Sequence, residues 1–237
     1  MKLFASDFDG TLYRHNEITA ADQQAIAAFQ KHHAFAVSTG RSLTGIDFAV
    51  QGVIRFDYYI LASGALILNA EKDPIFIRTI DRPLIKQIYQ RWNDLPMVFH
   101  AKDTVFTLDA PLPMQKHVDH LSQLPDQIYG LSIAAPNEAA AKQIVHFINE
   151  QYGEVMHAFQ NRTHIDAAPA GCSKGNAIRI LKQAGFSSCE AIGDSYNDIP
   201  MLAAADVAYT FPHAPAFVQK NADRIVESVA CALSYSL

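Results

Sequence analysis

Two carboxylates near the start of the chain, Asp7 and Asp9, are separated by one residue and follow an apolar stretch. In an extended chain, residues i and i+2 point to the same side, so the two carboxylates converge on one small volume. Gly10 tolerates the turn that the chain must then make. Two acids this close repel each other, and Mg²⁺ typically takes one or two carboxylates alongside substrate phosphate. The spacing favours a divalent-metal site at the end of a buried strand; the alternative is a strand end with solvated turn acids.

Three further segments carry groups that suit an anion. Residues 39–41, Thr-Gly-Arg, close a second apolar stretch. Lys174 stands at the start of a helical pattern, where its charge and the helix N-terminus both favour an anion. Residues 193–198, Gly-Asp-Ser-Tyr-Asn-Asp, follow a further apolar stretch. Taken singly, Lys174 reads as a surface lysine and Asp194 as a turn residue, but chance is a poor explanation for the ordered set.

Together these segments resemble the motifs of the haloacid dehalogenase superfamily, and within it those of the Cof-type phosphatases. The matching residues are Asp7-Phe8-Asp9-Gly10-Thr11, Ser38-Thr39-Gly40-Arg41, Ser173-Lys174-Gly175 and Gly193-Asp194-Ser195-Tyr196-Asn197-Asp198. The resemblance spans essentially the whole chain. It departs from the family pattern at two loops expected to face the site. Ser63-Gly64-Ala65 replaces the common Asn-Gly-Ala, and Phe211-Pro212-His213-Ala214 stands where Gly-Asn-Ala is common.

The resemblance implies a Mg²⁺-dependent phosphatase that acts on small phosphorylated metabolites, sugar phosphates first among them. Asp7 would be the nucleophile that forms an aspartyl phosphate, and Asp9 the general acid and base. Mg²⁺ would be held by Asp7, by the backbone carbonyl of Asp9 and by Asp194, with Asp198 supporting them or joining the ligands. The implied phosphate- and substrate-binding residues are Gly10, Thr39, Gly40, Arg41, Lys174 and Asn197.

Alternating strand and helix patterns predict an α/β fold with a Rossmann-like parallel sheet as the core. The long insertion within it resembles the α/β cap domain of Cof-type enzymes. Residues 1–80 and 167–237 are assigned to the core and residues 81–166 to the cap. The cap pattern includes a helix over Pro113–Leu121 and a strand pair around Asn161 and Arg162, which are candidates for contacting the leaving group. Since ligands bind beyond the carboxyl ends of parallel strands, the motifs are expected to meet there.

Composition narrows the classes of function. The chain has 237 residues, of which 49% are hydrophobic and 18% charged, with a net charge of -5. These values are typical of a globular enzyme and show no basic stripe for nucleic acid.

No stretch predicts a signal peptide or a membrane span. Three scattered cysteines indicate reduced thiols and a cytoplasmic protein. His117 and His120 are spaced like a metal pair but lack a third ligand. The sequence leaves the oligomeric state open.

Two other functions share parts of this pattern. A phosphosugar mutase of the same superfamily would keep all four motifs and return the phosphoryl group to the sugar instead of to water. A non-catalytic phosphosugar-binding module would be expected to lose Asp7 or Asp9, and this chain has both. The motifs favour hydrolysis.

Overall fold

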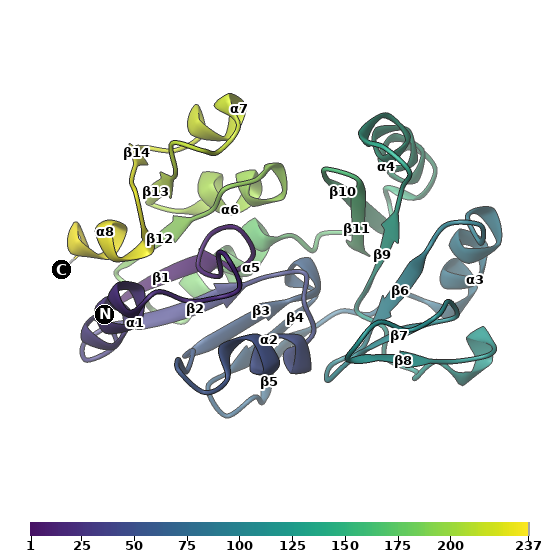
Figure 1. The fold of residues 1–237 in the computed structure, drawn as a ribbon, viewed down its shortest axis with the longest axis horizontal. Helices are drawn as coiled ribbons and strands as arrows, with labels where there is room; N and C mark the ends of the chain where they lie inside the picture. The colour runs from purple at the N-terminus through teal and green to yellow at the C-terminus, as the bar shows by residue number, and fades with distance from the viewer. Residues whose placement is uncertain (237) are drawn as a thin grey trace.

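The computed structural model describes residues 1–236, and the chain forms two β-sheets with helices packed on them (Figure 1). The larger sheet has the order β14-β13-β12-β1-β2-β3-β4-β5. Its strands are β1 (Lys2–Asp7), β2 (Ala34–Ser38), β3 (Tyr58–Leu61), β4 (Leu66–Asn69), β5 (Pro74–Ile77), β12 (Ser188–Ile192), β13 (Val207–Thr210) and β14 (Arg224–Ile225). All neighbouring pairs are parallel except β3 with β4 and β4 with β5.

Helices cover both faces of the larger sheet. They are α1 (Ala20–Phe29), α2 (Leu43–Val50), α5 (Lys174–Lys182), α6 (Ile199–Ala204), α7 (Ala216–Gln219) and α8 (Val229–Ser234), with short 3-10 turns η1 (Ala62–Gly64) and η3 (Tyr196–Asp198). Successive residues of β1 enter opposite apolar clusters: Phe4 packs with α1 and α8, whereas Leu3 and Ala5 pack with α5 and α6. This alternation is the strand period of two, and it buries β1 on both faces.

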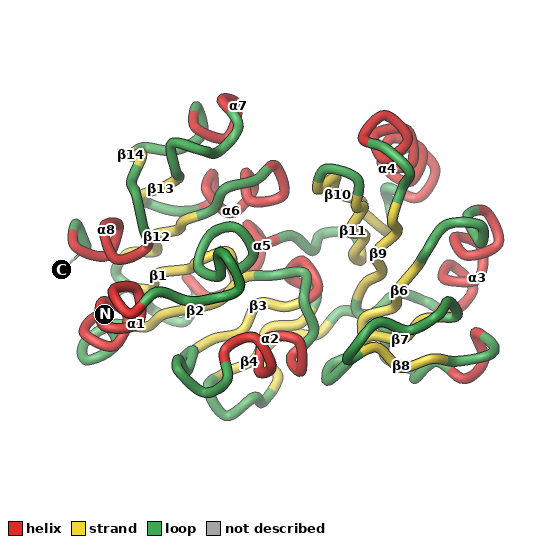
Figure 2. Tube along the Cα trace, viewed as in Figure 1, coloured by secondary structure: helices red, strands yellow, loops and turns green. Residues whose placement is uncertain are grey.

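The second sheet is formed by one continuous segment, residues 82–169, which we call the insert. Its order is β10-β11-β9-β6-β7-β8. Its elements are α3 (Arg82–Arg91), β6 (Met97–His100), β7 (Val105–Thr107), β8 (Gln115–His117), η2 (Leu121–Gln123), β9 (Gly130–Ala134), α4 (Glu138–Tyr152), β10 (Met156–Asn161) and β11 (His164–Pro169). An apolar cluster joins this sheet to α3 and α4, which lie on the side away from the larger sheet (Figure 2).

The predicted α/β class, with an insertion between parallel-sheet halves, is confirmed. The sequence pattern predicts helices over Glu138–Tyr152 and Ile199–Ala204, and α4 and α6 have these bounds. The division at residues 81 and 166 stays a prediction, and the last strand of the smaller sheet runs on to Pro169. The helix α2 was not predicted; its signal is Ser42, whose hydroxyl caps the helix by accepting from the backbone N–H of Gly45.

The helix predicted over Pro113–Leu121 is wrong. Within it, Gln115–His117 form the strand β8, which pairs in parallel with the edge of β7. Met114, just before this strand, has a left-handed φ of 72°, which a right-handed helix does not contain. Only Val118 of this segment is buried, so a helix here would have no apolar face to pack. Pairing with the open edge of β7 therefore prevails over the local pattern.

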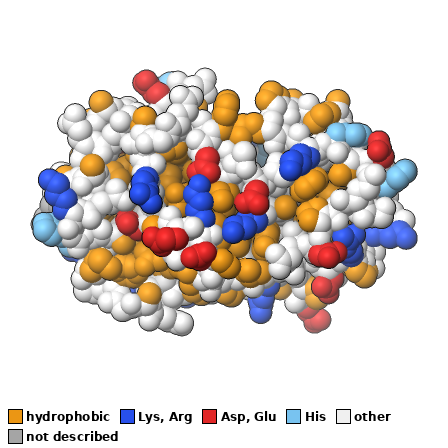
Figure 3. Space-filling view, turned by 90° about the horizontal axis from the view of Figure 1, so that it is seen from below, with side chains coloured by type: hydrophobic (Ala, Val, Ile, Leu, Met, Phe, Trp, Pro, Cys, Tyr) orange, Lys and Arg blue, Asp and Glu red, His pale blue; other side chains and the backbone are white. Residues whose placement is uncertain are grey.

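The distribution of charged side chains on the surface agrees with the composition, which gave no sign of a basic stripe. On the face shown in Figure 3, acidic and basic side chains are interspersed with hydrophobic ones, and no broad basic area is seen there. Within residues 1–236, no helix combines the length and apolar character that a bilayer crossing requires.

Candidate active site

The motif residues meet at one edge of the larger sheet because their strands are neighbours. Asp7 is the last residue of β1, which lies between β2 and β12. The loops that follow β2 and β12 carry Thr39 and Asp194. Gly10 has a φ of +85°, and a Cβ there would lie 2.7 Å from Asp194 Oδ2. Only glycine fits both the backbone conformation and the close approach.

Three carboxylates, those of Asp7, Asp194 and Asp198, form the centre of the site. They are the only group of three or more His, Cys, Asp or Glu side chains in residues 1–236 whose ligand atoms all lie within 4.8 Å of one another. Lys174 Nζ lies 2.5 Å from Asp7 Oδ1 and 2.6 Å from Asp198 Oδ1. Asp194 Oδ1 accepts a hydrogen bond of 2.8 Å from the Thr11 hydroxyl.

Burial shifts the pKa values of the ionisable side chains in this group. It raises the pKa of Asp7 well above its ordinary value of 3.8; the charge of Asp198 adds to the rise and that of Lys174 opposes it. Burial, followed by the charge of Asp198, also raises the pKa of Asp194. Burial alone would lower the pKa of Lys174, but the two carboxylates outweigh it and the pKa is raised, so the ammonium stays charged.

The donor set fits a hard divalent cation. When the three carboxylates are ionised, Lys174 neutralises one of their charges, which leaves two negative charges among oxygen donors. Mg²⁺ prefers such oxygens and would remove the repulsion. Asp198 is fixed independently, since its Oδ2 accepts from the backbone N–H groups of Asp194 and Ser195 at 3.1 and 3.0 Å. It is therefore placed to orient Lys174 as well as to carry charge.

The side chain of Asp9 lies apart from the three carboxylates. It is half exposed and forms a two-pronged ion pair with Arg41, with 2.9 Å from Nε to Oδ2 and 2.6 Å from Nη2 to Oδ1. The guanidinium also lies over the rings of Phe8 and Tyr13, at 5.1 and 5.3 Å from their centroids. This arrangement fixes the orientation of the Asp9 carboxylate. Any metal contact by Asp9 falls to its backbone carbonyl.

A cleft of about 740 Å³ lies between the larger sheet and the insert. Seven of the predicted site residues line it, namely Asp7, Asp9, Thr39, Gly40, Arg41, Lys174 and Asn197. The side-chain oxygen of Asn197 accepts a hydrogen bond from the Ser195 hydroxyl. The backbone N–H of Thr39 donates to the Ile60 carbonyl at 2.9 Å, which anchors this loop to β3. Gly10, Asp194 and Asp198 lie behind this lining, where they shape the carboxylate group.

The insert contributes side chains that the sequence motifs did not identify. His100, Ser132 and Asp166 line the cleft, and so does Asn161, whereas Arg162 does not. A signal was present in the strands: Ser132 and Asp166 are polar positions alternating with apolar ones along β9 and β11, which is the pattern of a sheet with one open face.

Comparison with known proteins gives the family. A family model described as haloacid dehalogenase-like hydrolase matches residues 4–231. The chain belongs to this family. It is 24% identical to an HMP-PP phosphatase from Cronobacter sakazakii over 86% of this chain and 81% of that protein. It is also 24% identical to a phosphoglycolate phosphatase from Sulfurisphaera tokodaii, over 94% and 86% of the two chains.

The fold of a haloacid dehalogenase-like hydrolase from B. subtilis superimposes with a TM-score of 0.89 at 19% identity, over 100% of both chains. The resemblance identified from the motifs is confirmed, and with it the expectation of a phosphoric monoester hydrolase. The roles of the individual residues stay predictions.

The Ser63-Gly64-Ala65 departure has a clear backbone setting in this haloacid dehalogenase-like hydrolase. Ala62, Ser63 and Gly64 all have positive φ, at 46°, 53° and 88°. A Cβ on Gly64 would lie 2.4 Å from the Ser173 carbonyl, so this turn packs directly under the N-terminus of α5. Asn adopts the left-handed region more readily than Ser does, so Ser63 occupies a less favourable conformation than the common Asn would. At the other departure, the ring of His213 stacks on Phe211 with centroids 5.0 Å apart.

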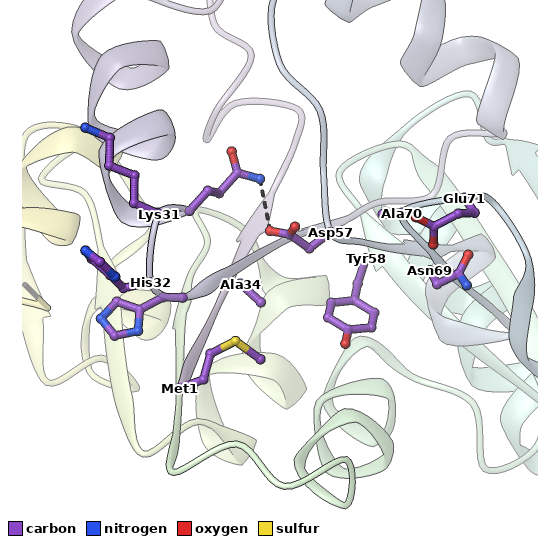
Figure 4. A pocket seen from close by; sticks show the side chains of 11 residues that line it. Met1, Lys31, His32, Ala34, Asp57, Tyr58, Asn69, Ala70 and Glu71 are labelled. Carbon is purple, nitrogen blue, oxygen red and sulfur yellow. Dashed lines mark hydrogen bonds between the residues drawn. The ribbon is translucent and has the colours of Figure 1, made fainter.

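A second hollow, of about 390 Å³, lies at the opposite end of the strands (Figure 4). It is bordered by the start of β2 at Ala34 and the start of β3 at Tyr58. The Asp57 carboxylate at its border accepts hydrogen bonds from the Gln30 side chain at 2.9 Å and from the backbone N–H of Phe35 at 2.8 Å. It thereby links the end of α1 to the sheet. No motif residue borders this hollow, and the hydrogen bonds of Asp57 give that acid a structural role.

Proposed function

We propose that the protein is a Mg²⁺-dependent phosphatase that hydrolyses small phosphomonoesters, sugar phosphates among them, through an aspartyl phosphate on Asp7. One observation carries this proposal. The Asp7 carboxylate ends a buried strand, contacts the Lys174 ammonium at 2.5 Å and belongs to a carboxylate group that fits a divalent cation. A carboxylate held in this way is oriented as a nucleophile, with positive charge beside it for the phosphoryl oxygens.

The residues divide the reaction into two displacements. An Asp7 oxygen attacks phosphorus, the bond from phosphorus to the ester oxygen breaks, and Asp9, in its protonated form, gives its proton to the departing alkoxide. Asp9 then takes a proton from water, which attacks the same phosphorus and releases phosphate and free Asp7. Lys174, the Thr39 hydroxyl and the Gly40 amide would hold the phosphoryl oxygens. When Asp9 is ionised, as the second displacement requires, its pair with Arg41 holds the carboxylate at the cleft.

Asp7, the Asp9 backbone carbonyl and Asp194 would hold Mg²⁺ with support from Asp198, and the bound ion supplies positive charge for the transferring group. We further propose that the insert acts as a cap that contacts the leaving group, because its residues form one wall of the cleft. The names of the two relatives state different substrates. They therefore support the phosphatase class but do not identify the alcohol part of this protein's substrate.

Phosphate release from p-nitrophenyl phosphate and a panel of phosphomonoesters tests this function. Activity should require Mg²⁺, cease in excess chelator and return on adding Mg²⁺. Asp7→Asn keeps the shape and loses the nucleophile, so kcat should fall by at least about 10³-fold. Asp126→Asn makes the same change on an exposed side chain of the insert and should leave kcat unchanged. Residual activity of Asp7→Asn within tenfold of wild type would contradict the proposal. Release without any bisphosphate activator separates a phosphatase from a mutase.

A further inference from the structure

The wall of the cleft that belongs to the insert carries a polar cluster made of His100, Ser132 and Asp166. These residues come from the adjacent strands β6, β9 and β11, and Ser132 is the direct register partner of Asp166. Their chain neighbours Leu131 and Ile165 are buried in the apolar cluster under α3 and α4. Because neighbouring residues of a strand point to opposite faces, the cluster stands on the face toward the cleft.

The hydrogen bonds of the cluster fix which atoms donate. Ser132 Oγ lies 2.5 Å from Asp166 Oδ1, and since an ionised carboxylate only accepts, the serine hydroxyl donates to it. His100 Nε2 lies 2.8 Å from the same Oγ, so Nε2 carries the hydrogen and donates. Nδ1 is then an acceptor, and it is buried without a hydrogen-bond partner in the part of the chain described. Burial lowers the pKa of His100, which favours this neutral form.

A second acceptor of the cluster is also free. No donor in residues 1–236 reaches Asp166 Oδ2. A Cβ on Gly40 would lie 3.5 Å from this oxygen, so the carboxylate stands beside the loop that we propose to hold the phosphoryl group. The Asp166 carboxylate and a phosphoryl group bound at this loop would repel each other strongly in a partly buried cleft. A substrate that binds here is stabilised if it places a hydrogen-bond donor against Asp166.

The insert offers no permanently charged cation at the cleft, since its only basic side chains in the described lining are the histidines His100 and His164. Among the described residues that line the cleft, it supplies no Lys or Arg. The arginine and lysine of the lining, Arg41 and Lys174, belong to the larger sheet's half of the molecule and already contact carboxylates. Much of the remaining wall is apolar, from Val98, Val105, Leu112, Pro113 and Met114. An alcohol with a negative charge therefore meets the Asp166 carboxylate without a lysine or arginine of the insert to offset it.

We propose that the His100, Ser132 and Asp166 cluster selects the alcohol part of the ester. It accepts hydrogen bonds from hydroxyl or amino groups close to the ester carbon and disfavours alcohols that carry a carboxylate. This inference rests on the proposed phosphatase function. It narrows the substrates to esters of neutral or positively charged alcohols rich in hydrogen-bond donors, and sets them apart from esters such as phosphoglycolate.

Glycerol 3-phosphate and 3-phosphoglycerate form a matched pair of test substrates. They share a carbon chain and differ in a terminal hydroxymethyl group against a carboxylate. For the wild type, kcat/KM for glycerol 3-phosphate should exceed that for 3-phosphoglycerate by at least about tenfold. Asp166→Asn keeps the shape and removes the charge, so this ratio should fall at least about fivefold. Asp126→Asn, the same change on an insert side chain that is 96% exposed, should leave the ratio unaltered.

Equal kcat/KM values for the two substrates in the wild type, or a preference for 3-phosphoglycerate, would overturn the inference. So would an unaltered ratio in Asp166→Asn. If that variant does not show a cooperative thermal transition, Asp166→Ser removes the same charge and is judged by the same ratio. A wild type inactive even on p-nitrophenyl phosphate would reject the phosphatase function itself, whereas activity there without the predicted preference rejects only the role of the cluster.

Discussion

Replacing Lys174 with Met tests whether the buried ion pairs hold the site together. The Lys174 side chain is 2% exposed, and its partners Asp7 and Asp198 are 8% and 0% exposed. Methionine keeps much of the volume but leaves both carboxylates without their cation. Removing one partner of a buried pair typically destabilises a protein by about 3–5 kcal/mol. For a chain of this size, that corresponds to a fall in Tm of roughly 6–20 °C.

The chain offers a control with the same geometry on the surface. Lys182 Nζ lies 2.6 Å from Asp206 Oδ1, the distance that also separates Lys174 from Asp198, but its side chains are 34% and 44% exposed. Solvated pairs contribute about 0–1 kcal/mol, so Lys182→Met should change Tm by no more than a few degrees. Burial is the variable that separates the two variants.

Urea and thermal unfolding of both variants would be measured near neutral pH, once in chelator and once with saturating Mg²⁺. The loss in Lys174→Met should be largest in chelator and smaller with Mg²⁺, because the cation supplies part of the missing charge and binds only the folded state. If Lys174→Met loses no more stability in chelator than Lys182→Met does, the buried network does not hold the site as argued. An equal loss with and without Mg²⁺ would show that the three carboxylates are not the metal site.

Three further predictions follow from burial and packing. Because burial raises the pKa of Asp7 above 3.8, the folded state holds this proton more tightly than the unfolded chain. The contribution of Asp7 to the stability of the metal-free protein should therefore fall as pH rises above 3.8, and Asp7→Asn should remove this part of the pH dependence in denaturation experiments. Gly175→Ala should destabilise the protein by about 1–3 kcal/mol in urea titrations, since the new Cβ would lie 2.0 Å from the Pro200 carbonyl oxygen. Gly45→Ala in α2 should be neutral or stabilising by up to about 1 kcal/mol, because the nearest atom to its Cβ, Ser42 Oγ, would lie 3.5 Å away. A thiol reagent at mildly alkaline pH should modify one cysteine of the native protein and all three after denaturation, because burial raises the pKa of two thiols to about 11. The two protected cysteines are Cys172 and Cys189, and the reactive one is Cys231.

The meeting of the motifs could be predicted because it follows from chain geometry. Asp7, Thr39 and Asp194 each end or follow a strand, and the carboxyl ends of parallel neighbours share one sheet edge. The pair between Asp9 and Arg41 could not, although both residues belong to recognised motifs. It depends on the side-chain directions of two loops 32 residues apart, and no local pattern encodes these.

The cluster on the insert shows a second limit of the sequence. His100, Ser132 and Asp166 come from three strands, β6, β9 and β11, that are neighbours in the sheet but are separated by other elements in the chain, so their contact depends on a topology that periodicity does not fix. The wrong helix over Pro113–Leu121 has a related cause, because its central residues pair with β7 and this tertiary contact overrides local preference.

Trapping the covalent intermediate tests the central claim most directly. The enzyme would be quenched during turnover of a phosphomonoester with Mg²⁺, treated with borohydride, which reduces an acyl phosphate to an alcohol, and digested for mass spectrometry. We expect Asp7 to be converted to homoserine, only when both ester and Mg²⁺ were present, with Asp9 unmodified. Reduction at any other carboxylate, or an unmodified Asp7 in samples quenched while phosphate is being released, would contradict the account.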